Sequence, residues 1–239
     1  MGIGDALNSN VAEKAYDDAI SKAAKQFGAF GGDFFKAARL VLFPIQIAAA
    51  MQDKLERTLE HVCDKVPPER RTTPPPLQIF GPIFENIKYM DDNSVLYELF
   101  EELLARSIDS ERIVEAHPAF IHIISQLSHD EAIILLELRN NDFDLVEFFD
   151  IDRETNHVIN RIVEECTLPK KGLQFPDTFE IGLDHLESLG LILMPKIKKD
   201  IIREEYLHVG SKLHMKIHLT GLGEFFVNAC VPEDGFRNK

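Results

Sequence analysis

Apolar residues recur every three or four positions through about the first 140 residues, the spacing that places them on one face of a helix. Small and apolar side chains repeat every four residues between Ala15 and Phe27. A wider apolar face runs from Val95 to Leu104. Ser128 and Glu131 have the spacing of a helix capping box, directly before an apolar run. The sequence therefore predicts helices in the N-terminal and central regions.

The last third of the chain mixes helical and alternating patterns. Strict alternation of apolar and polar residues from Leu213 to Leu219 predicts a half-buried strand, and Thr220 has the place of a helix cap after it. The predicted elements are a helix over 155–166 that buries Val158, Ile159, Ile162 and Val163, a helix over 177–189, a strand over 191–194, a loop over 196–211, the strand over 213–219 and a final helix. This order is typical of a winged-helix module whose wing is the long loop.

We therefore predict a mainly α fold, with N-terminal and central helical regions and a C-terminal winged-helix-like module that contains a small antiparallel β-hairpin. Five prolines between Pro67 and Pro76 favour extended geometry, which predicts a stiff spacer, with a Pro-rich docking peptide as the alternative. The predicted regions are an N-terminal helical region (1–66), a Pro-rich linker (67–80), an acidic helical region (81–126), a winged-helix-like domain (127–232) and a frayed tail (233–239).

The most apolar stretch, 34–51, bears on membrane contact. Its uncharged part, 40–51, is shorter than the roughly 20 residues that a spanning helix needs. It is interpreted as a buried helix bent at Pro44, or else as an interfacial segment. The candidate membrane-contacting residues are Phe34, Phe35, Leu40, Leu42 and Phe43. No signal peptide is expected from the first ten residues, so we expect a cytoplasmic protein, with peripheral contact to the inner membrane if the interfacial alternative holds.

Charge is concentrated in the middle of the chain. The net charge of −14 arises within residues 81–165, which carry 6 basic and 20 acidic side chains. This excess argues against coating nucleic acid through overall charge and points to 81–165 as a surface for a basic partner. Acidic pairs such as Glu101 and Glu102 are interpreted as solvated helix faces.

Candidate chemistry is sparse. Ser128, His129 and Asp130 are adjacent on a helix and cannot face one another, so the capping box explains the serine. His214 and His218 lie about 13 Å apart on a strand, too far to share a metal ion. No glycine-rich phosphate loop or dinucleotide fingerprint is present. We expect no catalytic residue, no metal and no cofactor. The three cysteines, Cys63, Cys166 and Cys230, form no CxxC pair and are expected to be free thiols.

A winged helix raises the question of DNA binding. The predicted recognition helix, 177–189, carries four acidic residues and no lysine or arginine, although it would have to meet phosphates. Basic residues gather instead in the expected wing, at Lys196, Lys198, Lys199, Arg203 and Lys212. A protein-binding module is therefore favoured over a DNA-binding one, with contact through the wing alone as the alternative.

Two runs, 74–109 and 117–140, resemble the abortive infection alpha family of bacterial proteins. The shared features are Gly81-Pro82-Ile83, Leu99-Phe100 with Leu103-Leu104, His117-Pro118-x-Phe120 and Leu127-Ser128-x-Asp130-Glu131-Ala132. The resemblance covers roughly residues 35–140. The family-motif residues Gly81, Pro82, Phe100, Leu104, His117, Pro118, Phe120, Ser128 and Glu131 are interpreted as caps, turns and core positions.

The resemblance implies a role in defence against bacteriophage and supplies no catalytic residues. The leading hypothesis is a non-enzymatic antiphage protein that acts through protein–protein contacts, with a protein partner or a homo-oligomer expected and no small-molecule substrate. Growth arrest of the host through the helix at 34–51 is a sharper form of it. The alternative is a winged-helix transcription regulator that binds DNA mainly through its wing. An enzyme is disfavoured because no convergent set of polar residues is evident.

Overall fold

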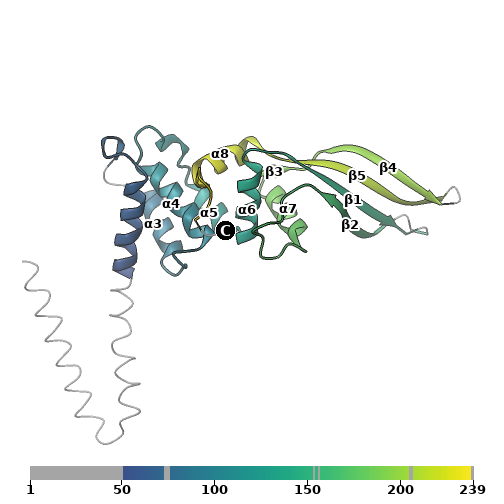
Figure 1. Cartoon of the computed structure of the whole chain (residues 1–239), viewed down its shortest axis with the longest axis horizontal. Coiled ribbons are helices and arrows are strands. Elements are labelled where there is room, and N and C mark those ends of the chain that lie inside the picture. Colours follow the sequence, from purple (N-terminus) through teal and green to yellow (C-terminus); the bar gives the residue numbers. More distant parts are fainter. Residues whose placement is uncertain (1–50, 73–75, 153, 156, 205–206, 238–239) are drawn as a thin grey trace, which may run out of the picture. The chain divides into compact units, whose positions relative to one another are not determined.

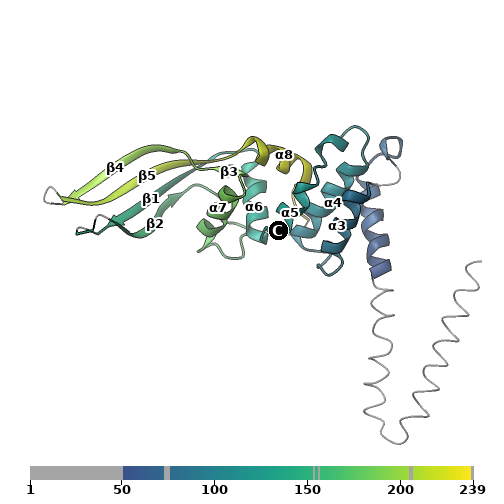
Figure 2. The same ribbon diagram turned by 180° about the vertical axis from the view of Figure 1, so that it is seen from behind.

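The computed structural model describes residues 51–72, 76–152, 154–155, 157–204 and 207–237. The chain divides into two compact units, Met1–Arg57 and Thr58–Lys239. Residues 51–57 of the first unit are helical, and the membrane-contact candidates at 34–43 lie outside the described residues. Everything below concerns the second unit, drawn in Figure 1 and from behind in Figure 2.

A buried helix, α4 (Val95–Ile108), organises the helical half of this unit. It contacts α3 (Leu77–Ile87), α5 (Ala119–Ile124), α6 (His129–Leu138) and α8 (Gly221–Cys230). Thirteen of its 14 residues are buried, the polar ones included. A helix surrounded in this way has to bury its charged side chains with partners.

Helix caps follow the sequence signals closely. Ser128 and Glu131 form the predicted capping box at the start of α6. The Thr220 side chain accepts from the Gly223 backbone N–H at the start of α8, as predicted. In α4 the cap is Ser94, whose side chain accepts from the Tyr97 backbone N–H. The predicted helix over 177–189 is also present, as α7 (Phe179–Ser188).

A five-stranded antiparallel sheet forms the other half of the unit. Its strands are β1 (Phe143–Ile151), β2 (Val158–Cys166), β3 (Ile192–Leu193), β4 (Lys196–Glu204) and β5 (Leu207–Leu219). The order is β2-β1-β5, and both β3 and β4 pair with β5. The four long strands extend together to one side of the helices (Figure 1).

The predicted fold class is therefore wrong. The chain is not mainly α with a small hairpin, because a substantial sheet accompanies the helices. The expected helix over 155–166 is strand β2, where Val158 and Ile159 are exposed rather than buried. The expected loop over 196–211 is β4 and the start of β5. Valine and isoleucine favour a pleated strand, and a short apolar run does not separate strand from helix by its period.

Strand β1 gave no sequence signal. Its buried face carries Phe143, Leu145 and Glu147, so a charged residue interrupts the apolar alternation that would have marked the strand. Glu147 is buried because Arg161 on the neighbouring β2 pairs with it. The partner is 14 residues away in sequence, which a local pattern does not reveal.

Two further predictions are corrected at the ends of the helical half. The described part of the Pro-rich linker packs against α4, since the Thr72 backbone N–H donates to the Ile108 carbonyl at 2.7 Å. Residues 77–80 belong to helix α3. The tail is not frayed over 233–237, because Phe236 is buried and Arg237 pairs with α4.

Candidate functional site

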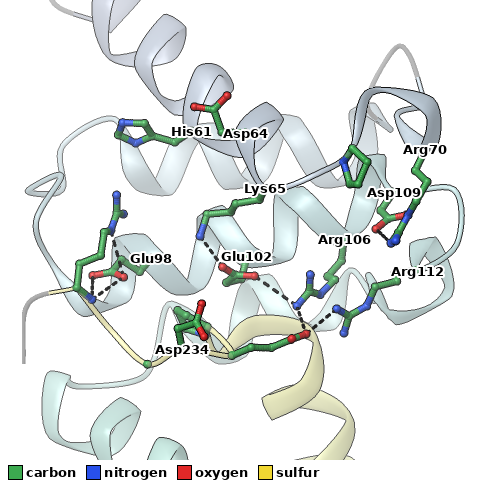
Figure 3. A pocket seen from close by; sticks show the side chains of 15 residues that line it. His61, Asp64, Lys65, Arg70, Glu98, Glu102, Arg106, Asp109, Arg112 and Asp234 are labelled. Atoms are coloured by element: carbon green, nitrogen blue, oxygen red, sulfur yellow. Dashed lines mark hydrogen bonds and ion pairs between the residues drawn. The ribbon is translucent and has the colours of Figure 1, made fainter.

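A charged pocket lies beside the buried helix α4. Glu98 and Glu101 are each 1% exposed and Glu102 is 6% exposed, so the expectation that the pair Glu101 and Glu102 faces solvent is wrong. The pocket has a volume of about 660 Å³ and is lined by acidic and basic side chains from α4, from the helical segment that ends at residue 64 and from the C-terminal segment (Figure 3).

The first set of partners comes from residues 58–65. The His61 Nδ1 atom lies 3.0 Å from Glu101 Oε1. The Lys65 ammonium donates to Glu102 Oε1 at 2.5 Å, and Figure 3 shows this side chain reaching across the pocket. These contacts place two buried carboxylates against the preceding helical segment.

The second set comes from the C-terminal segment, residues 231–237. The Arg237 backbone N–H donates to both carboxylate oxygens of Glu98, at 3.2 and 3.1 Å. The Arg237 side chain donates to Glu101 Oε2 at 2.6 Å. The Arg139 guanidinium donates to the Val231 and Pro232 carbonyls of this segment and to the Val227 carbonyl on α8.

Two arginines meet a single glutamate at the pocket's edge. Arg112 Nη1 donates to Glu233 Oε1 at 2.8 Å, and Arg106 Nη2 lies 3.4 Å from the same oxygen. The hydrogen bond from Arg112 lowers the pKa of the Glu233 carboxyl. A separate pair, Arg70 and Asp109, closes the far side, and its hydrogen bond lowers the pKa of Asp109. The arrangement uses cations to hold carboxylates from different segments together.

A second hollow, of about 570 Å³, lies on one face of the sheet beside α7. At its base, Arg161 donates to the buried Glu147 at 2.9 and 2.5 Å and to Asp184 of α7 at 2.6 and 3.0 Å. Apolar side chains line most of the rest of it, together with Glu187 and Ser211, and the exposed Lys196 and Lys199 stand at its rim. We call this hollow the sheet groove.

The described residues offer few other features that suggest chemistry. Within them, no group of three or more His, Cys, Asp or Glu side chains is placed to hold a metal ion. None of the described helices is long and apolar enough to cross a membrane. Cys63, Cys166 and Cys230 are free, and burial raises the pKa of the Cys230 thiol.

Comparison with protein families gives a match over residues 47–230 to the family described as abortive infection alpha. The chain belongs to this family. The resemblance predicted from the sequence is thus confirmed, and it extends through the sheet and α8. The family links the chain to abortive infection.

Other comparisons add little to this assignment. The chain is similar to a solved structure of an uncharacterized protein from the hydrocarbon-degrading marine bacterium Alcanivorax borkumensis SK2. The two are 16% identical, with a TM-score of 0.32, and the similarity covers 50% of this chain and 94% of the other. No curated protein matches the chain.

In this abortive infection alpha protein the family-motif residues lie in the helical half, and none of them lines the charged pocket. Gly81 and Pro82 lie within α3, and Phe100 and Leu104 are buried on α4. Pro118 is the N-cap residue of α5.

The remaining motif residues make local contacts. The Ala119 backbone N–H donates to His117 Nδ1, and the Phe120 ring packs edge-on against Phe226 at 5.2 Å. Ser128 and Glu131 cap α6, and Glu131 also lies 2.5 Å from His185 Nδ1. These residues are caps, core positions and a turn, whereas Gly81 and Pro82 lie inside α3 without being buried and fit none of these roles.

The basic residues of the expected wing lie on two strands. Lys196, Lys198, Lys199 and Arg203 are exposed along β4. Lys212 lies on β5, where it pairs with Glu164 at 2.7 Å.

The charged pocket is what sequence reasoning missed. Its acidic residues recur at positions i, i+3 and i+4 on α4, a spacing shared by a solvated face and a buried polar face. Only the basic partners distinguish the two cases. They come from residues 61, 65 and 237, far away along the chain.

Proposed function

We propose that this protein acts in abortive infection as a non-enzymatic component that contacts another protein through the sheet groove. The supporting observation is a row of apolar side chains on one face of the sheet, which Ser211 of β5 interrupts between Phe149 and Ile201. Val158 opposes Ile151, and Phe149 lies across Ser211 from Ile201. Val158 is 57% exposed and Ile201 51% exposed. Exposed apolar side chains that gather on one face of a sheet are typical of interaction sites.

The faces of the sheet suit such a contact better than its edges. Edge strand β2 has register shifts against β1, and β4 has register shifts against β5. Lysines also line β4, with Lys196, Lys198 and Lys199 exposed. Bulges and lysines on an edge oppose strand-to-strand pairing with another chain. A partner is therefore expected to pack on the apolar face.

The chemistry of the groove specifies the partner's contact segment. Its walls include Met194 and Met215, flexible side chains that adapt to different apolar surfaces. At the rim, Lys196 and Lys199 offer exposed positive charge. We therefore propose a partner segment of apolar residues flanked by aspartate or glutamate. This revises the expectation of a basic partner for 81–165, because several carboxylates of that block are buried in internal pairs.

Phage plating tests the proposal with two matched substitutions. Val158→Asp introduces a charge into the apolar row of the groove. Val114→Asp makes the same change at a side chain that is 80% exposed on the helical half. Cells with the wild-type gene or Val114→Asp should resist phage, whereas cells with Val158→Asp should lose resistance. Circular dichroism checks that both variants fold.

The plating results decide between the possible roles. Equal resistance with Val158→Asp and Val114→Asp would exclude the groove as the contact surface. Equal plaque numbers with and without the wild-type gene would contradict the defence role itself. Ile201→Asp, on β4 beyond the residues that line the groove, tests whether the contact surface extends across Ser211.

A finer proposal concerns the apolar stretch 34–51, whose larger part precedes the described residues. We propose that it contacts the membrane during infection and arrests host growth. Fractionation of infected and uninfected cells tests this, with the protein expected to sediment with membranes after infection. A strictly soluble distribution in both conditions would remove this proposal.

Nucleic acid is the second candidate partner. The exposed basic row on β4, at Lys196, Lys198, Lys199 and Arg203, favours it, although Asp200 pairs with Lys198 and so reduces the row's charge. Gel-shift titration with DNA from the gene's upstream region, repeated across a salt series, tests this candidate. Contact with phosphates predicts affinity that falls steeply with salt. An unshifted band at low salt would end this alternative.

A further inference from the structure

The edge of the charged pocket contains two arginines that converge on one oxygen atom. Arg112 Nη1 lies 2.8 Å and Arg106 Nη2 lies 3.4 Å from Glu233 Oε1. Figure 3 shows the two guanidinium groups side by side, with dashed lines to the same carboxylate. Arg112 directs only its Nη1 atom at this site, because its Nε and Nη2 atoms bond to Glu115. Two guanidinium groups that meet at one oxygen atom are an arrangement that recognises oxyanions.

Arg106 is incompletely compensated in this arrangement. Its side chain is 8% exposed, and its Nε atom has no hydrogen-bond partner among the described residues. Its distances to carboxylate oxygens are 3.4 Å to Glu102, 3.4 Å to Glu233 and 3.6 Å to Glu115. Charge-assisted hydrogen bonds are normally about 2.7–2.9 Å long. A buried guanidinium with only long contacts would be stabilised by a better-placed anion.

The Glu233 carboxylate is placed so that another anion can displace it from Arg106 and Arg112. Its side chain is 69% exposed, and it follows α8 on the C-terminal segment rather than lying within a helix or strand. Because the Glu233 carboxylate is mostly in solvent, it stays hydrated when it leaves the arginines, and an incoming anion then compensates their charge in its place. The matched family region ends at residue 230, so the arginines lie inside it and Glu233 lies outside.

The geometry points to a phosphate-binding site at Arg106 and Arg112, which Glu233 occupies until a phosphate group displaces its carboxylate. A phosphate offers three acceptor oxygens and up to two negative charges, whereas Glu233 uses one oxygen for both arginines. The pocket, at about 660 Å³, has room for a larger molecule behind that group. Free phosphate and the phosphate of a nucleotide share this chemistry. The site is separate from the sheet groove and does not depend on that proposal.

Isothermal titration of the full-length protein with inorganic phosphate tests the site, with adenosine monophosphate titrated in a parallel arm. Glu233→Gln removes the competing charge. Glu111→Gln is the matched control, because Glu111 is also an exposed glutamate, 66% exposed, but pairs with Arg70. We expect the apparent dissociation constant of Glu233→Gln to fall about tenfold, since apparent affinity scales with the fraction of open sites. Glu111→Gln should remain at the wild-type value.

A second substitution tests whether the tighter phosphate binding of Glu233→Gln depends on Arg112. Adding Arg112→Gln to Glu233→Gln should abolish the tighter binding, and Arg112→Lys, which keeps the charge but not the fork, should lose most of it. The proposal is overturned if Glu233→Gln and Glu111→Gln bind equally, or if the tighter binding survives both substitutions at position 112. If Glu233→Gln binds only adenosine monophosphate more tightly than the wild type does, the site is assigned to nucleotides. If it binds both ligands more tightly, the site is assigned to free phosphate.

Discussion

Removing Arg237 should destabilise the protein more than neutralising the glutamate it pairs with. Arg237 is 47% exposed, whereas Glu98 and Glu101 are 2% and 0% exposed in their side chains. Arg237→Ala therefore leaves two buried carboxylates with fewer partners. Glu101→Gln instead leaves a half-exposed guanidinium that water can solvate. Removing the exposed partner of this ion pair should therefore cost more stability than neutralising the buried one.

The size of the stability loss depends on which hydrogen-bond partners each carboxylate keeps. Removing one partner of a buried pair costs about 3–5 kcal/mol. After Arg237→Ala, Glu98 still accepts the backbone N–H of residue 237 and Glu101 keeps His61. The lower end, about 3 kcal/mol, is therefore expected for Arg237→Ala. For Glu101→Gln we expect about 1 kcal/mol, because the amide still accepts a hydrogen bond and the arginine is solvated.

Urea unfolding followed by circular dichroism measures both changes. Arg203→Ala is the matched control, an exposed arginine on β4 that should change stability by less than about 0.5 kcal/mol. The double variant Arg237→Ala/Glu101→Gln should lose less stability than the two single losses added together, because the glutamine no longer buries a charge. The reasoning is refuted if Arg237→Ala costs no more than Glu101→Gln or Arg203→Ala.

Three further predictions concern single positions. Ser128→Ala removes the α6 cap and should cost about 1 kcal/mol in urea unfolding, and an unchanged midpoint would contradict the cap's role. Gly223→Ala should cost about 3 kcal/mol, because its Cβ would lie 1.9 Å from the Leu191 carbonyl oxygen, and wild-type stability would show that the backbones are not so close. The pKa of Asp109 is lowered by Arg70, so the unfolded chain binds more protons. Stability present above about pH 4 is then lost as pH falls through the folded-state pKa. Asp109→Asn should reduce this acid sensitivity, measured as melting temperature between about pH 2 and 6, and an identical profile would argue against it.

The sequence predicted those features that depend on residues close together in the chain. The caps at Ser128 and Thr220 were predictable because each side chain bonds to a backbone group three residues away. The alternation from Leu213 to Leu219 marked part of β5, and the motif residues identified the family.

The β1–β2 hairpin shows where local signals failed. Glu147 is a charged residue at a buried strand position, and Val158 and Ile159 are exposed on the neighbouring strand. Both features contradict the binary pattern that sequence analysis relies on. The burial of Glu147 depends on pairing across strands, because Arg161 on β2 donates a hydrogen bond to it.

By itself, the sequence determined the family, the caps and most helices, because these depend on residues within a few positions of one another. It also placed the excess of negative charge in 81–165. The tertiary structure decided what those charges do. In the sequence, the three glutamates of α4 have the spacing of a solvent-facing helix surface. In the folded protein they are buried against the side chains of Lys65, His61 and Arg237. A carboxylate can be buried only beside a compensating charge, and that charge was set by the fold, from both ends of the second unit.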